Sequence, residues 1–223
     1  MSTSTRPATR TARQQANCSR SMNAPSAQTA RNRRSVQRWN AHDPPEPTSA
    51  YTGGTLPTCD GAAIAASGWT RPVVGTVGSG FRTPDRPGHD GVDIMAGRGT
   101  VIHAASGGVV VKVRCNVAGN SWDAPFSPSM PCDRDGYPGL GGCGWYVEIR
   151  HAADIVSRYC HMVRQPNVHV GQTVTAGQPI GNVGTSGNSS GPHVHYEIHE
   201  GYPATEANAT NPVPFMRQKG VPL

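Results

Sequence analysis

The chain has 223 residues, with 27 glycines and 20 prolines but only 3 phenylalanines. This length allows one good-sized core with appendages, and the abundance of glycine and proline favours short strands and turns over long helices. No apolar run is long enough to span a membrane, which excludes an integral membrane protein built from helices. We therefore expect a mainly β protein without a membrane span.

The formal net charge of +6 resides in the first 50 residues, where eight arginines face only Asp43 and Glu46. The rest of the chain is neutral. Because residues 1–50 lack hydrophobic periodicity and apolar area, we expect a disordered basic arm. Its charge would attract an anionic polymer, either an acidic wall polymer or a nucleic acid. A merely solvated tail is the simpler interpretation, since Trp39 is the one aromatic side chain available for base stacking.

The six cysteines include no Cys-x-x-Cys pair, a pattern that indicates disulfides in an oxidising compartment. We favour Cys132–Cys143, which would close a small loop rich in glycine and proline, and keep Cys115–Cys160 as a second pairing between strand ends. Residues 1–47 show no apolar run typical of a signal peptide. Export would therefore need another route, or the native protein would start at a different residue. Alternatively, the protein would lyse a host cell from within.

After residue 69 the chain predicts short strands joined by turns. Strands are predicted at 107–113, 146–151 and 156–161, which are rich in β-branched and aromatic residues. A hairpin is predicted at 170–181, where short apolar steps are separated by glycines.

Two regions of the chain are predicted to be irregular. Residues 116–143 form a long insertion with four prolines, a length that is usual for functional or mobile loops, and we expect it to wall a substrate groove. The tail after Gly201 is predicted to be extended.

Two histidines, His193 and His195, alternate within a strand-like run and would share one face about 6.6 Å apart. His89 and Asp93 are four residues apart, follow Pro87-Gly88, and would share a face of an extended segment. Two imidazoles and a carboxylate make a three-ligand set for zinc with a fourth position left for water, the pattern of a catalytic site. Zinc is the default metal for these ligands, and either His193 or His195 would complete the set.

The remaining histidines carry weaker signals. His161 ends a predicted strand, and on its own it is more typical of a packed side chain. The same holds for four others: His42, His103, His151 and His169. Glu148 and His151 are an odd number of residues apart and would lie on opposite faces of a strand. His199 would lie about 13 Å from His195 along the strand, too far to share a ligand set.

Several of these motifs together resemble the lysostaphin/LytM-type zinc endopeptidases of bacterial cell walls. They are His89-x-Gly-x-Asp93, the strand-end His161, the segment 170–181, and Gly184-Thr-Ser-Gly-Asn-Ser-Ser-Gly-Pro-His193-Val-His195-Tyr-Glu. The resemblance covers about residues 69–199, in the family's order.

The resemblance implies one zinc ion held by His89, Asp93 and His195, with His161 and His193 as catalytic residues. It also implies an antiparallel, sandwich-like β domain over 51–223 with a groove above the sheet. Family members cleave peptide bonds in the stems or cross-bridges of peptidoglycan. Some relatives have lost zinc ligands and only activate other wall hydrolases, but every ligand position is filled here.

The partner implied by the resemblance is a peptidoglycan peptide, and the arm adds a candidate contact to an anionic wall polymer. We do not expect nucleic acid as a partner. The location implied is extracellular, in the cell wall or in the periplasm, with a phage lysin as the alternative. In the mechanism we expect, zinc activates a water molecule, one of His161 and His193 accepts its proton, and the other stabilises the oxyanion.

Overall fold

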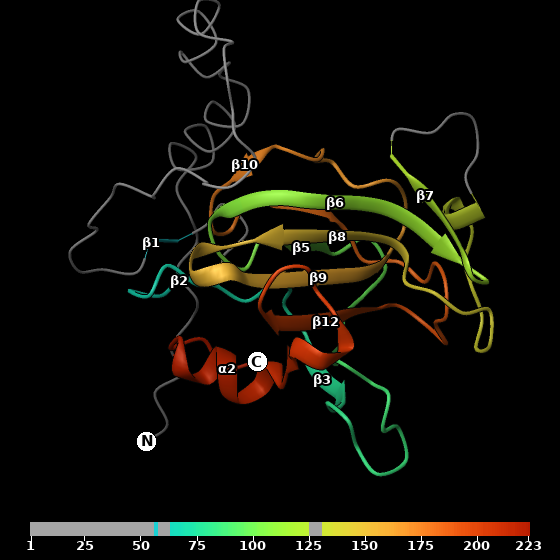
Figure 1. Ribbon diagram of the computed structural model, residues 1–223, viewed down its shortest axis with the longest axis horizontal. Helices are drawn as coiled ribbons and strands as arrows, with labels where there is room; N and C mark the ends of the chain where they lie inside the picture. The colour runs from blue at the N-terminus through green and yellow to red at the C-terminus, as the bar shows by residue number, and fades with distance from the viewer. Residues whose placement is uncertain (1–55, 58–62, 125–130) are drawn as a thin grey trace, which may run out of the picture. The chain divides into compact units, whose positions relative to one another are not determined.

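A large antiparallel sheet organises the computed structural model, which describes residues 56–57, 63–124 and 131–223 (Figure 1). The order of its main strands is β10-β6-β8-β9-β12-β4-β3, with β7 added to β6 and β13 to β12. In chain order these strands are β3 (Thr76–Ser79), β4 (Val92–Met95), β6 (Gly108–Val117), β7 (Asn120–Asp123), β8 (Gly144–Arg150), β9 (Ile155–Met162), β10 (Thr173–Val174), β12 (His193–Glu200) and β13 (Ala209–Thr210). The predictions of a mainly β fold and of an antiparallel sheet are confirmed.

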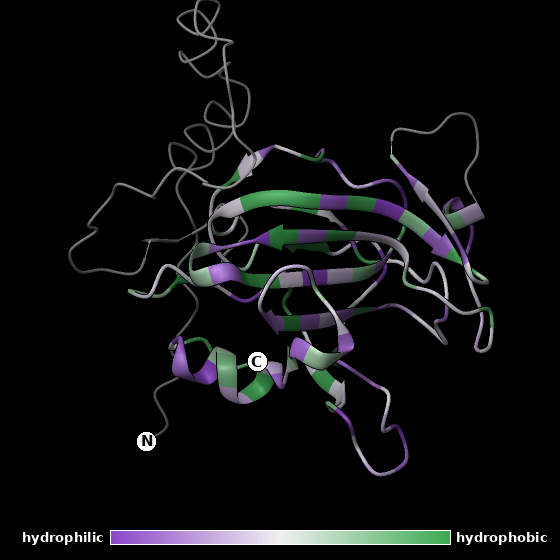
Figure 2. Cartoon of the chain, in the orientation of Figure 1, coloured by the Kyte–Doolittle hydropathy of each residue, from purple (hydrophilic) through white to green (hydrophobic). Residues whose placement is uncertain are grey.

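A second layer contributes to the same hydrophobic core. Strands β5 (Val101–His103) and β11 (Pro179–Asn182) form a separate two-stranded sheet. Their Ile102 and Ile180 are fully buried in one cluster with Val110 and Val147 of the large sheet. Hydrophobic stretches run along the first half of β6 and through β8 (Figure 2). The core therefore lies between two layers and holds the central strands rigidly in register.

The remaining elements are short. They are β1 (Leu56–Pro57), β2 (Ala63–Ile64), the 3₁₀ turns Pro131–Asp133, Ala152–Asp154 and Glu206–Asn208, and the helix α2 (Pro212–Gln218). Within the described ranges, no helix is long and apolar enough to cross a membrane. The predicted arm, residues 1–50, lies outside the described residues.

The predicted hairpin at 170–181 is wrong, because its two strands have different partners. β10 pairs with β6 of the large sheet, whereas β11 pairs with β5. The glycines do form turns, since Gly171 and Gly177 have φ of 86° and 77°. The turn at Gly177, closed by a bond from Gln178 N to Thr175 O, leads the chain from one sheet to the other.

The prediction of an extended tail after Gly201 is also wrong, because α2 follows. Asn211 caps this helix by accepting a hydrogen bond from Val213 N at 3.0 Å, and a proline occupies its first position. Both are ordinary signals of a helix start. Phe215 and Met216 are buried in the core and anchor the helix.

Both predicted disulfides are wrong. The structure pairs Cys115 with Cys132 and Cys143 with Cys160, with Cα–Cα distances of 5.7 and 4.9 Å. Cys143 directly precedes β8 and Cys160 lies near the end of β9, and these two strands are antiparallel neighbours. Strand pairing therefore decides the partner, and closeness along the chain does not.

The insertion 116–143 is less irregular than expected. It contains β7, which pairs with β6 from Arg114↔Asp123 to Val117↔Asn120. Its later part packs against the glycine loop that leads to β12, through bonds from Gly136 N to Thr185 O and from Asn188 N to Gly142 O at 2.7 and 2.9 Å. A Cβ on Gly136 would lie 1.7 Å from Gly187 O, so only glycine permits this close approach.

Candidate metal centre

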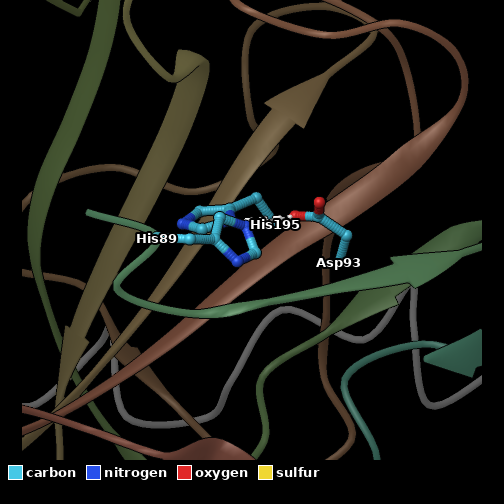
Figure 3. Close-up of side chains that lie close together, drawn as sticks. All are labelled: His89, Asp93 and His195. Atoms are coloured by element: carbon cyan, nitrogen blue, oxygen red, sulfur yellow. Dashed lines mark hydrogen bonds and ion pairs between the residues drawn. The ribbon is translucent and has the colours of Figure 1, made fainter. Parts of the chain in front are cut away.

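Two neighbouring strands place the predicted ligands opposite each other. β12 pairs with β4 so that His195 lies across from Asp93. His89 precedes β4 in a turn closed by a bond from its N–H to Arg86 O at 3.0 Å. Gly91 lets the chain pass close to β12, since a Cβ there would lie 2.4 Å from Tyr196 O. The resulting convergence of the three side chains is drawn in Figure 3.

One atom from each side chain contributes to a tight triangle. His89 Nε2 lies 2.9 Å from Asp93 Oδ1, His195 Nδ1 lies 3.0 Å from the same oxygen, and the two nitrogens are 3.0 Å apart. All three side chains are buried. The structure therefore brings His89, Asp93 and His195 together, whereas His193 Nε2 lies farther from Asp93 Oδ1, at 3.6 Å.

The hydrogen bonds behind the triangle show that this set fits a metal ion. His89 Nδ1 lies 2.6 Å from Gly80 O, which can only accept, so this nitrogen carries the proton and Nε2 presents a lone pair. His195 Nε2 likewise faces the Glu197 carboxylate at 3.0 Å, which leaves the lone pair of the neutral ring on Nδ1. Two lone pairs and a carboxylate oxygen aimed at one point are a donor set for zinc, oriented by partners behind the ligands.

The same contacts determine the charges of Asp93 and His195. Burial of Asp93 opposes its ionisation, but its contacts with His195 and His89 outweigh burial and hold its pKa well below the usual range. Burial also opposes protonation of His195, yet its bonds to Asp93 and Glu197 raise its pKa to about 9. A metal ion must displace this proton from Nδ1, as is general for histidine ligands.

The two predicted catalytic histidines flank the triangle. The rings of His161 and His193 are 4.7 Å apart, and His161 lies 6.1 Å from the His195 ring. His193 Nε2 is 3.6 Å from Asp93 Oδ1. Each ring is anchored through Nδ1 to a backbone carbonyl, that of Ser186 at 2.7 Å and that of Gly191 at 2.8 Å.

His161 is held in an unusual state. Its φ is 65°, in the left-handed region that non-glycine residues seldom adopt and that is often found at functional sites. Burial, together with the neighbouring His195 and His193, lowers the pKa of His161 to about 3. A neutral ring with its proton on Nδ1 leaves Nε2 as an acceptor.

Glu197 lies behind His195 and was not among the predicted site residues. Its Oε1 binds His195, and its Oε2 binds His199 Nε2 at 2.6 Å and the Arg158 guanidinium at 2.7 Å. Burial opposes the charge of Glu197, but the bonds from His195 and His199 lower its pKa far below the usual value. The period of two from His193 to His199 is a signal that could have revealed this buried polar face.

Arg86 is a second residue that the sequence analysis did not identify. Its Nη1 donates to Asp93 Oδ2 at 2.9 Å, on the carboxylate oxygen that lies outside the triangle. Its side chain is 46% exposed.

The triangle lies in a cavity of about 860 Å³. One wall comes from the insertion, as predicted, and includes Asn116, Pro138 and Gly142, while the glycine loop contributes Asn188, Ser189 and Ser190. This volume falls within the range of small-molecule and peptide sites.

The other described histidines lie away from the triangle. His151 binds Gly107 O and Ser157, and Glu148 binds Lys112 and Arg158, so these two residues do not form a joint site. His199 supports Glu197 as described above. His103 is buried and His169 is exposed, and neither lines the cavity. His42 lies outside the described residues.

Comparisons with known proteins identify relatives of this chain. The family model described as "Peptidase family M23" matches residues 129–212. Peptidoglycan DD-endopeptidase ShyC of Vibrio cholerae is 36% identical over 110 residues, which are 49% of this chain and 20% of ShyC. Murein hydrolase activator NlpD of Salmonella dublin is 28% identical over 178 residues, 77% of this chain and 38% of NlpD. The chain thus covers well under half of either curated relative.

Among solved structures, the catalytic domain of the prophage-encoded M23 protein EnpA from Enterococcus faecalis is similar. It is 32% identical, with a TM-score of 0.46, and the match covers 61% of this chain and 88% of that domain. The residues matched by the family model include His161 and the His193–His195 pair, two of the motifs that carry the resemblance. The chain belongs to peptidase family M23, the lysostaphin/LytM-type peptidases.

Proposed function

We propose that this chain is a zinc-dependent endopeptidase that hydrolyses peptide bonds in the stems or cross-bridges of bacterial peptidoglycan. The observation that supports the proposal most is the convergence of His89, Asp93 and His195 within a groove, with His161 and His193 beside them. The family includes peptidoglycan endopeptidases such as ShyC.

In this proposal His89 Nε2, Asp93 Oδ1 and His195 Nδ1 hold the zinc ion. Bound zinc would supply Lewis-acid activation of water and of the scissile carbonyl. Glu197 and the Gly80 carbonyl keep the two imidazoles in the required tautomers. Arg86 neutralises the outer oxygen of Asp93.

His161 and His193 move the protons. Each has its Nδ1 committed to a backbone carbonyl, so Nε2 is the atom that meets the reacting groups. One ring, neutral, accepts the proton of the attacking water at Nε2, and the other, as an imidazolium with a second proton on Nε2, donates that N–H to the oxyanion. The buried surroundings strengthen both interactions.

A non-catalytic module that binds the wall or activates another hydrolase is the second candidate. The relationship to NlpD supports it, since that relative is named an activator. The filled ligand and catalytic positions favour the enzyme, because an activator has no need for two further imidazoles in a groove beside a metal set.

We further propose that the peptidase unit comprises residues 51–223 and acts outside the cytoplasm on peptidoglycan. The two disulfides support an oxidising location. Binding of the arm, residues 1–50, to an anionic wall polymer remains part of this proposal and rests on its charge alone.

Digestion of purified peptidoglycans of several wall types, with and without a chelator, tests the function. We expect new amino and carboxyl termini, identified by mass spectrometry, that disappear with chelator and return with added zinc. Protein that carries zinc but releases no peptide from any wall would favour the activator.

A further inference from the structure

Arg86 stands out among the residues that line the cavity. It is the one lysine or arginine in the described part of the cavity lining. The acidic side chains there already have partners: Arg82 binds Asp90 at 2.8 Å, and Arg158 binds Glu197. The rest of the lining is imidazole, neutral polar side chains, glycine, proline, Met95 and Cys143.

The guanidinium of Arg86 is only partly used. It has five N–H donors, of which one donates to Asp93, and the side chain is 46% exposed. The other oxygen of Asp93, Oδ1, lies within 3.0 Å of His89 Nε2 and of His195 Nδ1. Among the described residues, the remaining donors of Arg86 have no partner, so they are available to a ligand in the groove beside Asp93.

The backbone around Arg86 is braced. Its N–H donates to Thr83 O at 2.9 Å, and its carbonyl accepts from His89 N. Arg82 in the same loop binds both Asp90 and the carbonyl of Glu206. The same turn thus fixes the backbone of both His89 and Arg86 beside the triangle.

We propose that Arg86 binds a carboxylate of the substrate, so that the groove selects peptides with a free carboxylate near the scissile bond over neutral peptides. The proposal rests on the proposed function and specifies its substrate. A planar guanidinium with free donors matches a carboxylate in a paired, charge-assisted geometry. Stem peptides carry such carboxylates, whereas cross-bridges made of glycine are neutral.

The test uses two cross-linked stem-peptide dimers that differ only in whether the carboxylates are free or converted to carboxamides. Wild type, Arg86→Gln and Arg86→Lys are compared by kcat/KM after the zinc content of each has been matched. Arg98→Gln is the control, because Arg98 is 47% exposed, pairs with Asp135 and does not line the cavity.

We expect wild type and Arg98→Gln to prefer the free-carboxylate dimer by about 10- to 100-fold, the range for a hydrogen-bonded charge. Arg86→Gln should lose most of this preference through a lower kcat/KM for that dimer, and Arg86→Lys should keep part of it. If Arg86→Gln lowers kcat/KM for both dimers by the same factor, Arg86 acts only through Asp93 and the proposal is wrong.

Binding separates this proposal from the proposed function. Affinities of both dimers are measured by calorimetry in the His161→Ala background, with and without Arg86→Gln. Tighter binding of the free-carboxylate dimer that depends on Arg86 supports carboxylate recognition. If the protein with His161 intact nevertheless hydrolyses neither dimer, the proposed endopeptidase activity is contradicted while carboxylate recognition stands. Hydrolysis without preference for either dimer contradicts carboxylate recognition and supports the enzyme.

Discussion

At the scale of single residues, removal of a proposed zinc ligand should have a different effect from removal of a proposed catalytic histidine. His195 belongs to the triangle, whereas His161 lies beside it. We expect His195→Ala to lose bound zinc and hydrolysis together, and His161→Ala to retain zinc while turnover falls by at least 100-fold. Metal analysis of the purified proteins and a peptide-release assay measure both effects. Full zinc occupancy in His195→Ala would contradict the ligand assignment.

Glu197 tests the role of the hydrogen bonds behind the ligands. Glu197→Gln keeps the shape of the side chain but weakens the acceptor for His195 Nε2 and leaves Arg158 without one of its partners. We expect zinc affinity to fall by about 10- to 100-fold, the usual effect of such a change. Competition titration against a chelator measures it. As a control, Glu200→Gln changes an exposed residue on the same strand and should leave the affinity unchanged.

Much of the site could be predicted from the sequence, because the spacing of His89, Asp93 and the His193–His195 pair carries the information. The residues alone left His193 and His195 as alternatives, and the resemblance chose His195. Arg86 could not be placed in the same way, because its bond to Asp93 depends on how a turn is folded against β4. Glu197 lies two residues from His195 on one face of β12, so the period of two could have placed it.

At the scale of elements, the site depends on the contact between β4 and β12, and Gly91 keeps them close. A Cβ at this position would lie 2.4 Å from Tyr196 O, which is backbone and cannot move aside. We expect Gly91→Ala to lower the free energy of unfolding by about 2 kcal/mol or more, as overpacking does, and to weaken zinc binding. Gly88→Ala is the matched control, since nothing lies within 4 Å of its added Cβ. Denaturant unfolding of the two variants compares them.

The strands β8 and β9 could be predicted because their sequences alternate locally. The prediction failed where the structure depends on which distant strand a segment pairs with. The segment 170–181 has the composition of a hairpin, yet its two strands pair with β6 and β5 in different sheets. The disulfides failed for the same reason, since the partner of Cys143 depends on the pairing of β8 with β9. Pairing between distant segments is not encoded in any short window of sequence.

At the scale of the whole domain, a buried histidine far from the triangle couples stability to pH. His151 is packed against Trp69, with ring centroids 5.0 Å apart, and is bonded to Gly107 O and Ser157. Burial lowers its pKa to about 4. Between pH 6.5 and 4 the unfolded chain therefore binds more protons at this residue than the folded one, so the free energy of unfolding falls as the pH is lowered.

We expect this contribution, up to about 3 kcal/mol, to be fully present above pH 6.5 and lost by about pH 4. Denaturant unfolding of wild type and His151→Gln across this range measures it. The difference in stability between them should narrow as the pH falls. A pH-independent difference for His151→Gln would show that His151 does not titrate in this way.

The disulfides also determine what a protease could achieve against this domain. Any single cut between Cys115 and Cys132, or between Cys143 and Cys160, leaves the two resulting pieces covalently joined. The groove wall formed by the insertion would then stay attached after nicking. A nicked molecule would migrate as one species under non-reducing conditions and separate into two fragments only after reduction. The groove wall would thus stay attached to the domain even when the backbone within it is cut.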